Sequence, residues 1–172
     1  MWYPVQNQNG PIQVFPSYSA YLFIAEALGY SKTLQISNLY PGRQENGSSI
    51  TTALGDRSAG QLVAYGFWDA GSPSSRSFPT KLALLNLEIF NQTQTIARPM
   101  AQFDISAYRQ NTSRPVVIRR MQAPGADTKL GSMTTWAGQT FASGVGVGTL
   151  VEETQLGSLV SVVASEAALV FL

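Results

Sequence analysis

The chain has 172 residues, of which 44% are hydrophobic and 12% are charged, and its formal net charge is +1. This length and apolar content suit one buried core and one domain, while the near-neutral charge argues against nucleic acid or an acidic membrane as a partner. The sequence contains no cysteine and no histidine, which excludes disulfides, thiolate metal sites and a histidine-based catalytic triad.

No stretch of the sequence approaches the roughly 18 apolar residues of a membrane span. Metal binding by oxygen ligands alone would need clustered acids, but the acids are scattered along the chain. We therefore expect no membrane insertion, no metal site and no cofactor. The five arginines between Arg98 and Arg120 are interpreted as solvated strand and loop positions.

The first thirty residues predict one helix. Residues 1–15 are polar and rich in Gln and Asn, apart from Trp2 and Tyr3. Pro16 and Gly29 then supply a start and a stop signal for a helix over residues 17–29. The apolar side chains that recur at three- and four-residue spacing, and so predict its apolar stripe, are Tyr18, Tyr21, Leu22, Ala25 and Leu28.

After Gly29 the hydrophobic pattern changes to a period of two or to short apolar runs bounded by turn residues, which is typical of strands. The predicted strands cover residues 34–39, 50–54, 61–69, 81–90, 100–105, 116–121, 134–140, 159–163 and 167–172. Many short strands at near-regular spacing favour a mainly β fold, an antiparallel β-sandwich with one N-terminal amphipathic helix.

Three Asn-X-Ser/Thr triplets, beginning at Asn46, Asn91 and Asn111, lie in segments with turn composition. Such triplets are acceptors for N-linked glycans in secreted proteins. We therefore predict glycosylation at these sites and a secreted or extracellular location. The aromatic side chains are the remaining candidates for function, because they offer flat apolar faces to sugars. Trp68 and Trp136 lie inside strand patterns, which favours packing in the core or between domains.

Five segments together resemble the C-terminal part of family 79 glycoside hydrolases, the fungal β-glucuronidase-like enzymes. They are SYSAYLFIAEALG, LVAYGFWDAG, LALLNLEIFN, MTTWAGQTF and LVSVVASEAALVFL. The resemblance implies that residues 1–30 are a remnant of the last strand and helix of a (β/α)₈ barrel and that residues 31–172 are the β-sandwich. It also places Trp2 and Tyr3 at the mouth side of that barrel, which makes them candidates for carbohydrate binding.

The resemblance implies that the two catalytic glutamates of the family lie on earlier barrel strands, so no catalytic residue is expected here. Glycoside hydrolysis needs two carboxyl groups that flank the sugar bond, and the acids of this chain form no evident pair. Glu152 and Glu153 are adjacent and should point to opposite faces of a strand. Glu88 and Glu166 are interpreted as solvent-facing.

Four hypotheses follow from the sequence. The first is a noncatalytic accessory domain that stabilises or completes the catalytic barrel of a family 79-like protein. The second is a carbohydrate-binding module or lectin, and the third is a self-assembling structural protein. The fourth is one piece of a processed enzyme. The expected partners are accordingly the barrel portion, a second copy of the chain, or carbohydrate.

Overall fold

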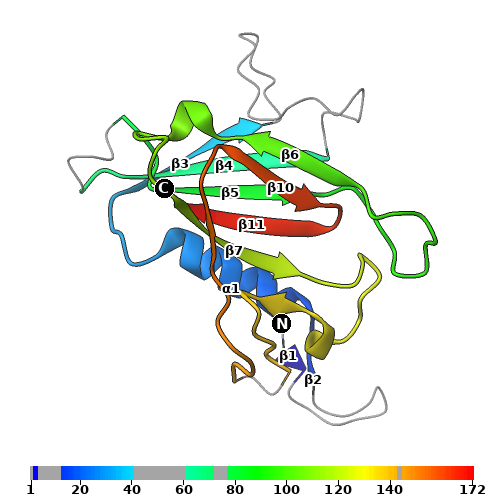
Figure 1. Cartoon of the computed structure of the whole chain (residues 1–172). Helices are drawn as coiled ribbons and strands as arrows, with labels where there is room; N and C mark the ends of the chain where they lie inside the picture. Colours follow the sequence, from blue (N-terminus) through cyan, green and yellow to red (C-terminus); the bar gives the residue numbers. More distant parts are fainter. Residues whose placement is uncertain (1, 4–12, 41–60, 72–76, 143–144) are drawn as a thin grey trace.

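The computed structural model describes residues 2–3, 13–40, 61–71, 77–142 and 145–172. It contains one large antiparallel sheet, with a smaller sheet on one face and the helix α1 (Ser17–Leu28) on the other (Figure 1). The predicted class, mainly β with antiparallel sheets and an N-terminal helix, is confirmed, although the two sheets of the sandwich differ greatly in size. The division at residue 30 stays a prediction.

The main sheet places the last strand of the chain in its middle. In spatial order its strands are β3 (Leu34–Tyr40), β4 (Leu62–Asp69), β5 (Lys81–Asn86), β11 (Glu166–Phe171), β7 (Val116–Gln122) and β8 (Thr135–Trp136), and β9 (Glu153–Gln155) also pairs with β7. Leu169 lies between Ala83 of β5 and Arg119 of β7. The last residues of the chain therefore form a central strand of the sheet and join its two halves.

The smaller sheet consists of β6 (Met100–Asp104) and β10 (Leu159–Val163). Two further short strands, β1 (Trp2–Tyr3) and β2 (Gln13–Val14), pair with each other ahead of α1. Short 3₁₀ helices cover Ser106–Tyr108 and Gly131–Met133. Both of these strand pairings are antiparallel.

Alternation along the strands divides the core into two clusters. On β4, Ala64 faces the smaller sheet and Phe67 faces α1. On β11, Val170 faces the smaller sheet and Leu169 faces α1. The sandwich cluster comprises Leu39, Leu62, Ala64, Leu82, Leu84, Ala101, Phe103, Ile105, Val116, Ile118, Val160, Val162, Ala168 and Val170. The helix cluster comprises Phe23, Ala27, Phe67, Ala83, Trp136, Ala137, Ala167 and Leu169.

The end of α1 is held by both backbone and side-chain contacts. Gly29 adopts a positive φ of 61° and its N–H donates to the Ala25 carbonyl at 2.9 Å, a conformation that favours glycine. Lys81 Nζ donates to the carbonyls of Glu26 at 2.6 Å and Ala27 at 3.2 Å. These carbonyls have no partner within the helix, and a cation at this end also complements the helix dipole.

The face of α1 that packs against the sheet differs from the predicted stripe. Ser19, Phe23 and Ala27 are buried, whereas Tyr21 and Leu28 of the predicted stripe are exposed. The prediction was wrong about the packed face because α1 is apolar nearly all round. Apolar residues at three- and four-residue spacing therefore fit more than one face, and spacing alone does not select one.

Three strand predictions need correction. The strand predicted over residues 134–140 is only the two residues of β8, because Ala137 and Gly138 turn with φ of 48° and 78°. Strand β5 ends at Asn86, whose side chain accepts the N–H of Glu88 at 3.1 Å. Strand β9 was missed, since its sequence carries no apolar alternation. The strand predicted over residues 50–54 lies outside the described residues.

Candidate functional surfaces

Glu152 and Glu153, of which Glu153 is the first residue of β9, diverge as predicted. Glu153 pairs with Arg120 at 2.7 Å, and Glu152 accepts a hydrogen bond from Arg119 Nε at 2.9 Å. Arg119 and Arg120 are neighbours on β7 and point to opposite faces of the sheet. The two carboxylates are thus separated by the strand that binds them, and they form no pair for glycoside hydrolysis.

A polar anchor ties α1 to the sheet. The Glu26 carboxylate accepts hydrogen bonds from Arg119 Nη1 and, at 3.0 Å, from Trp136 Nε1. The Trp136 ring also packs edge-on against Phe23, with ring centroids 5.3 Å apart. Trp136 is buried, which agrees with its interpretation as a core residue. The anchor therefore fixes α1 through charge-assisted bonds and ring packing together.

Trp68 also has a packing role. It is partly buried against the sandwich cluster, and its ring lies over Gly66, where an added Cβ would approach the ring to 2.5 Å. The absence of a side chain at Gly66 thus provides the space for the indole. This position agrees with the interpretation of Trp68 as a packing residue.

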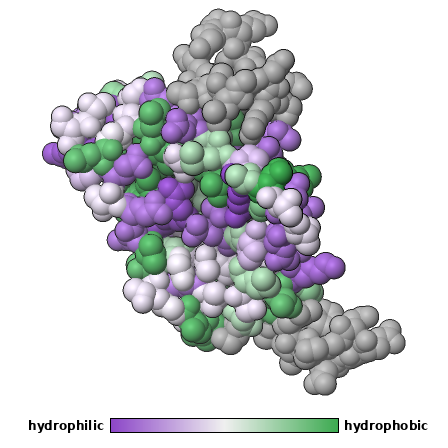
Figure 2. All heavy atoms as spheres, turned by 45° about the vertical axis from the view of Figure 1, so that its right-hand side comes forward, coloured by the Kyte–Doolittle hydropathy of each residue, from purple (hydrophilic) through white to green (hydrophobic). Residues whose placement is uncertain are grey.

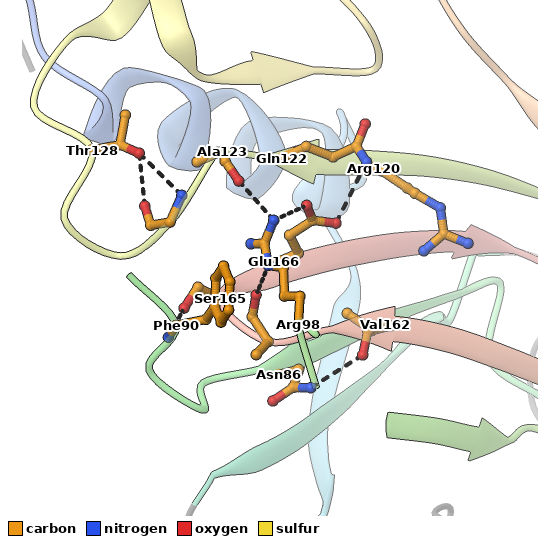
Figure 3. A network of polar contacts seen from close by, with 12 residues as sticks. Asn86, Phe90, Arg98, Arg120, Gln122, Ala123, Thr128, Val162, Ser165 and Glu166 are labelled. Carbon is orange, nitrogen blue, oxygen red and sulfur yellow. Dashed lines mark hydrogen bonds and ion pairs between the residues drawn. The ribbon is translucent and has the colours of Figure 1, made fainter. Parts of the chain in front are cut away.

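Glu166, the most buried acid among the described residues, belongs to a network between the two sheets (Figure 3). Its side chain is 7% exposed and pairs with Arg98 Nη1 at 3.0 Å. Burial raises the pKa of Glu166 above its ordinary value of 4.5, while Arg98 and Gln122 act in the opposite direction. The interpretation of Glu166 as solvent-facing was wrong, because it precedes Ala168 and Val170 on the side of β11 that the smaller sheet covers.

The same network fastens the segments around the smaller sheet. Arg98 Nε and Nη1 donate to the carbonyls of Ala164 at 2.8 Å and Ala123 at 2.9 Å. Asn86 Nδ2 donates to the Val162 carbonyl at 3.1 Å (Figure 3). These contacts pair most of the polar groups of the network, as packing requires, and among the described residues only Arg98 Nη2 is a buried side-chain polar atom without a hydrogen-bond partner. They give Glu166 a structural role.

The arginines are less solvated than the sequence suggested. Arg109 is buried, and its guanidinium donates to the carbonyls of Gly157 at 2.5 Å, of Asn111 at 3.4 Å and of Arg114. Among the arginines of residues 98–120, only Arg114 is exposed. The prediction failed because residue type gives no information on which carbonyls surround a guanidinium. The sequence did not predict that these guanidinium groups are held by backbone carbonyls of neighbouring segments.

The outer face of α1 is apolar and exposed. The side chains of Tyr21 and Ile24 are each 50% exposed, and Leu28 is 39% exposed. At about 100° per residue, Tyr21 and Leu28 lie nearly opposite Phe23 and Ile24 lies about a quarter turn away from it, so all three point away from the sheet. The helix thus presents one apolar face to the sheet and a second to its surroundings.

The side of the main sheet that carries α1 has further exposed apolar residues. Ile36 lies directly opposite Phe67 in the β3–β4 ladder, and Tyr65 precedes Phe67 by two residues, so all three share the helix-bearing face. Ile36 and Tyr65 remain exposed. We call these residues and the outer face of α1 the open apolar surface: Tyr21, Ile24, Leu28, Ile36 and Tyr65.

Elsewhere the surface is more mixed. On the face shown in Figure 2, hydrophilic residues extend across the middle and hydrophobic residues lie around them in separate groups. A cleft of about 620 Å³ lies at the end of the main sheet where β5 and β7 begin and β11 ends. It is lined by Phe78, Pro79, Thr80, Arg109, Gln110, Asn111, Arg114, Pro115, Val116 and Leu172.

The structure does not bring the residues predicted to bind sugar or carry glycans into one site. Trp2 and Tyr3 form β1, and their side chains lie outside the described part of the chain. Asn46 also lies outside it. Asn91 is partly buried in a turn, and Asn111 is exposed in another turn beside the cleft. Binding and glycosylation at these residues stay predictions.

Within the described ranges, no group of three or more metal-ligating side chains is assembled. No helix of the described part combines the length and the apolar character needed to cross a bilayer. The arrangement defines a β-sandwich-like domain whose polar clusters are internal ties between its own elements.

Comparison with known proteins then identifies the family. The model described as "Glycosyl hydrolase family 79 C-terminal beta domain" matches residues 64–169. The chain therefore belongs to the C-terminal β domains of glycoside hydrolase family 79, as its sequence resemblance indicated. No curated protein matches the chain.

A solved structure has a similar fold. It is a 4-O-α-L-rhamnosyl-β-D-glucuronidase from Fusarium oxysporum, in complex with Rha-GlcA. The match has a TM-score of 0.52 and 24% sequence identity, and it covers 64% of this chain and 23% of the fungal enzyme. The chain thus corresponds to less than a quarter of that enzyme's length, and at this identity the likeness concerns the fold alone.

Proposed function

We propose that this chain is a noncatalytic accessory domain that stabilises or completes the catalytic barrel of a family 79-like protein. The observation that supports the proposal is that α1 has two apolar faces, one packed on the sheet and one exposed. Phe23 packs on the main sheet, while Tyr21, Ile24 and Leu28 form an apolar outer face. A helix that is hydrophobic all round is typically covered on all sides. The barrel is the partner that the family membership supports.

The chemistry of the described acids supports a noncatalytic role. Glu26, Glu152, Glu153 and Glu166 are each bound to an arginine of the chain itself. A glycosidase instead needs a protonated acid and a free carboxylate on either side of a substrate. The four carboxylates serve as structural ties, and the catalytic glutamates are assigned to the barrel.

Burial of the open apolar surface would contribute free energy to the docking of a partner. Complete burial of a large apolar side chain contributes about 1.5 to 3 kcal/mol, and the five residues of this surface are between about one third and one half exposed. Covering them would contribute several kcal/mol in total before the entropic cost of association. The net charge of +1 offers little repulsion to any partner.

Purification from the source organism tests the assignment. An antibody against the chain should capture material whose peptide map includes a (β/α)₈ barrel, on the same or a tightly held polypeptide. Ile24→Asp should lower the melting temperature of that barrel-containing protein, and Ile89→Asp, at an exposed position beyond the end of β5, serves as the matched control. Equal effects of the two variants, or a captured protein without a barrel, would contradict the proposal.

The isolated chain should also hydrolyse aryl β-glucuronides and related aryl glycosides only at background rates. Turnover that is lost on replacing Glu88 or Glu166 by glutamine would show that the chain is itself an enzyme.

Light scattering at increasing concentration separates docking on a barrel from self-assembly. A dimer of the wild type that dissociates in Ile24→Asp would favour self-assembly, and saturable oligosaccharide binding by the isolated chain would favour a carbohydrate-binding module.

A further inference from the structure

Asn111 differs from an ordinary exposed asparagine in the way its amide is held. Its Oδ1 accepts the N–H of Ser113 at 2.9 Å, and its carbonyl accepts the N–H of Arg114 at 3.4 Å. The oxygen of the amide is thus occupied by the turn that contains it. The nitrogen, which is the atom that carries an N-linked glycan, is on the other branch of the amide, and the residue is exposed.

The turn that carries Asn111 is fixed from beneath by Arg109. The buried guanidinium donates to the carbonyls of Asn111 and Arg114, both in the turn, and to that of Gly157, which precedes β10. A group attached to Asn111 would therefore leave the protein in a defined direction.

The cleft of about 620 Å³ lies beside this asparagine. Its described lining combines the apolar faces of Phe78 and Pro115 with the polar groups of Thr80, Gln110 and Arg114. Sugars present C–H faces and hydroxyl groups together, and aromatic rings are suitable surfaces for the former. A sugar attached at the rim would find both kinds of contact without crossing open solvent.

Asn91 provides the contrast within the same chain. It is partly buried, and its N–H donates to Gln94 Oε1 at 2.9 Å. The next N–H, that of Gln92, donates to Asp127 Oδ1 at 3.0 Å. Asn91 also does not line the cleft. The two described acceptor triplets thus differ in both exposure and surroundings.

We propose that Asn111 carries an N-linked glycan in the secreted protein and that the first sugars of this glycan lie in the cleft. The glycan covers Phe78 and Pro115 and shields this end of the main sheet. The proposal depends on passage through the secretory pathway and is independent of the proposed docking on a barrel.

Peptide mapping of the protein from its source organism tests the modification. Trypsin places the three triplets in separate peptides, residues 44–57, 82–109 and 110–119. The second and third peptides stay whole because trypsin cleaves poorly before Pro99 and Pro115. Enzymatic deglycosylation in ¹⁸O-water should convert Asn111 into labelled aspartate in the third peptide. An unmodified third peptide overturns the proposal. Glycans on the other peptides would then confine the failure to Asn111, and their absence would overturn the prediction of N-glycosylation for all three triplets.

The rate of deglycosylation tests the position of the sugars. Peptide-N-glycosidase should release the glycan several-fold more slowly from the folded protein than from the denatured protein. Phe78→Ala and, with less risk to folding, Arg114→Ala should accelerate release from the folded protein. Ile89→Ala, at an exposed site beyond the other end of β5, should leave the rate unchanged. Equal rates in the wild type and both cleft variants would overturn the placement of the glycan in the cleft.

Discussion

The two faces of the main sheet differ in how completely the chain covers them. On one side, β6 and β10 close the sandwich cluster, and Phe103, Ile105 and Val160 have no exposed surface. On the other side, α1 covers the helix cluster but leaves Ile36 and Tyr65 exposed on the same face of the sheet. The first face is covered by elements of the chain itself, whereas the second leaves apolar side chains exposed.

The polar contacts differ in the same way. Between the sheets, Glu166 and Arg98 form a largely buried ion pair, in which Arg98 also donates to backbone carbonyls and Glu166 also accepts from Gln122. Beneath α1, the anchor of Glu26 and Arg119 extends to the more exposed Glu152. Buried pairs depend strongly on both partners, while exposed pairs contribute little. The closed face should therefore respond more strongly to substitution than the open face.

The largest expected effect is on the sandwich cluster. Phe103→Ala should lower the free energy of unfolding by about 3 to 5 kcal/mol, because it leaves a cavity in a fully buried site. Tyr65→Ala, on the open face, should cost less than about 1 kcal/mol in the isolated chain. Urea denaturation measures both. Similar losses for the two variants would show that the faces do not differ.

Removal of Arg98 should have the next largest effect. Arg98→Met leaves the buried Glu166 carboxylate without its cation, and we expect a loss of roughly 3 kcal/mol. The matched variant Arg119→Met affects the more exposed anchor under α1 and should cost about half as much or less. Thermal and urea unfolding at neutral pH provide the comparison, and the reverse order would contradict it.

Trp136→Phe sharpens the comparison within the helix-bearing face. The phenyl ring keeps an aromatic contact with Phe23 but cannot donate the hydrogen bond to Glu26. A bond to a charged group contributes about 1.5 to 3 kcal/mol, and partial exposure of Glu26 places the expected loss near the lower value. Hydrogen exchange should become faster in α1 and stay unchanged in β10. Unchanged protection of α1 would mean that the anchor is dispensable.

A substitution on the outer face of α1 should have a small effect in the isolated chain. Ile24→Asp is expected to lower the free energy of unfolding by about 1 kcal/mol, because the side chain is only half buried. Phe23→Ala, one residue earlier but buried, should cost about 3 kcal/mol. A large loss in monomeric Ile24→Asp would show that this face is covered by the chain itself.

The smallest effect is a pH dependence from Glu166. Since burial raises its pKa above 4.5, the folded state keeps the proton at pH values where the unfolded chain has released it. The corresponding stability is fully present below about pH 4.5 and is lost as the pH rises through the folded-state pKa. The difference in unfolding free energy between the wild type and Glu166→Gln should therefore fall over this range. A constant difference would contradict the raised pKa.

Much of the fold is determined by local sequence. The start and stop signals around residues 17–29 specify the helix, and the period-two patterns specify β4, β7 and β10. The adjacent positions of Glu152 and Glu153 also predict their divergence, because successive side chains of an extended segment point to opposite sides. These features depend only on backbone geometry, and the sequence predicts them without knowledge of the neighbouring elements.

Tertiary structure decided the features that depend on contacts between elements distant in the sequence. It placed Phe23 of α1 against the sheet, since a helix apolar on several faces has no preferred side until a partner is present. It buried Glu166 because Arg98, distant in sequence, supplies the compensating charge. It also formed β9, whose sequence has no strand pattern, by offering it the free edge of β7. In each case a long-range contact supplies free energy that the local sequence does not encode.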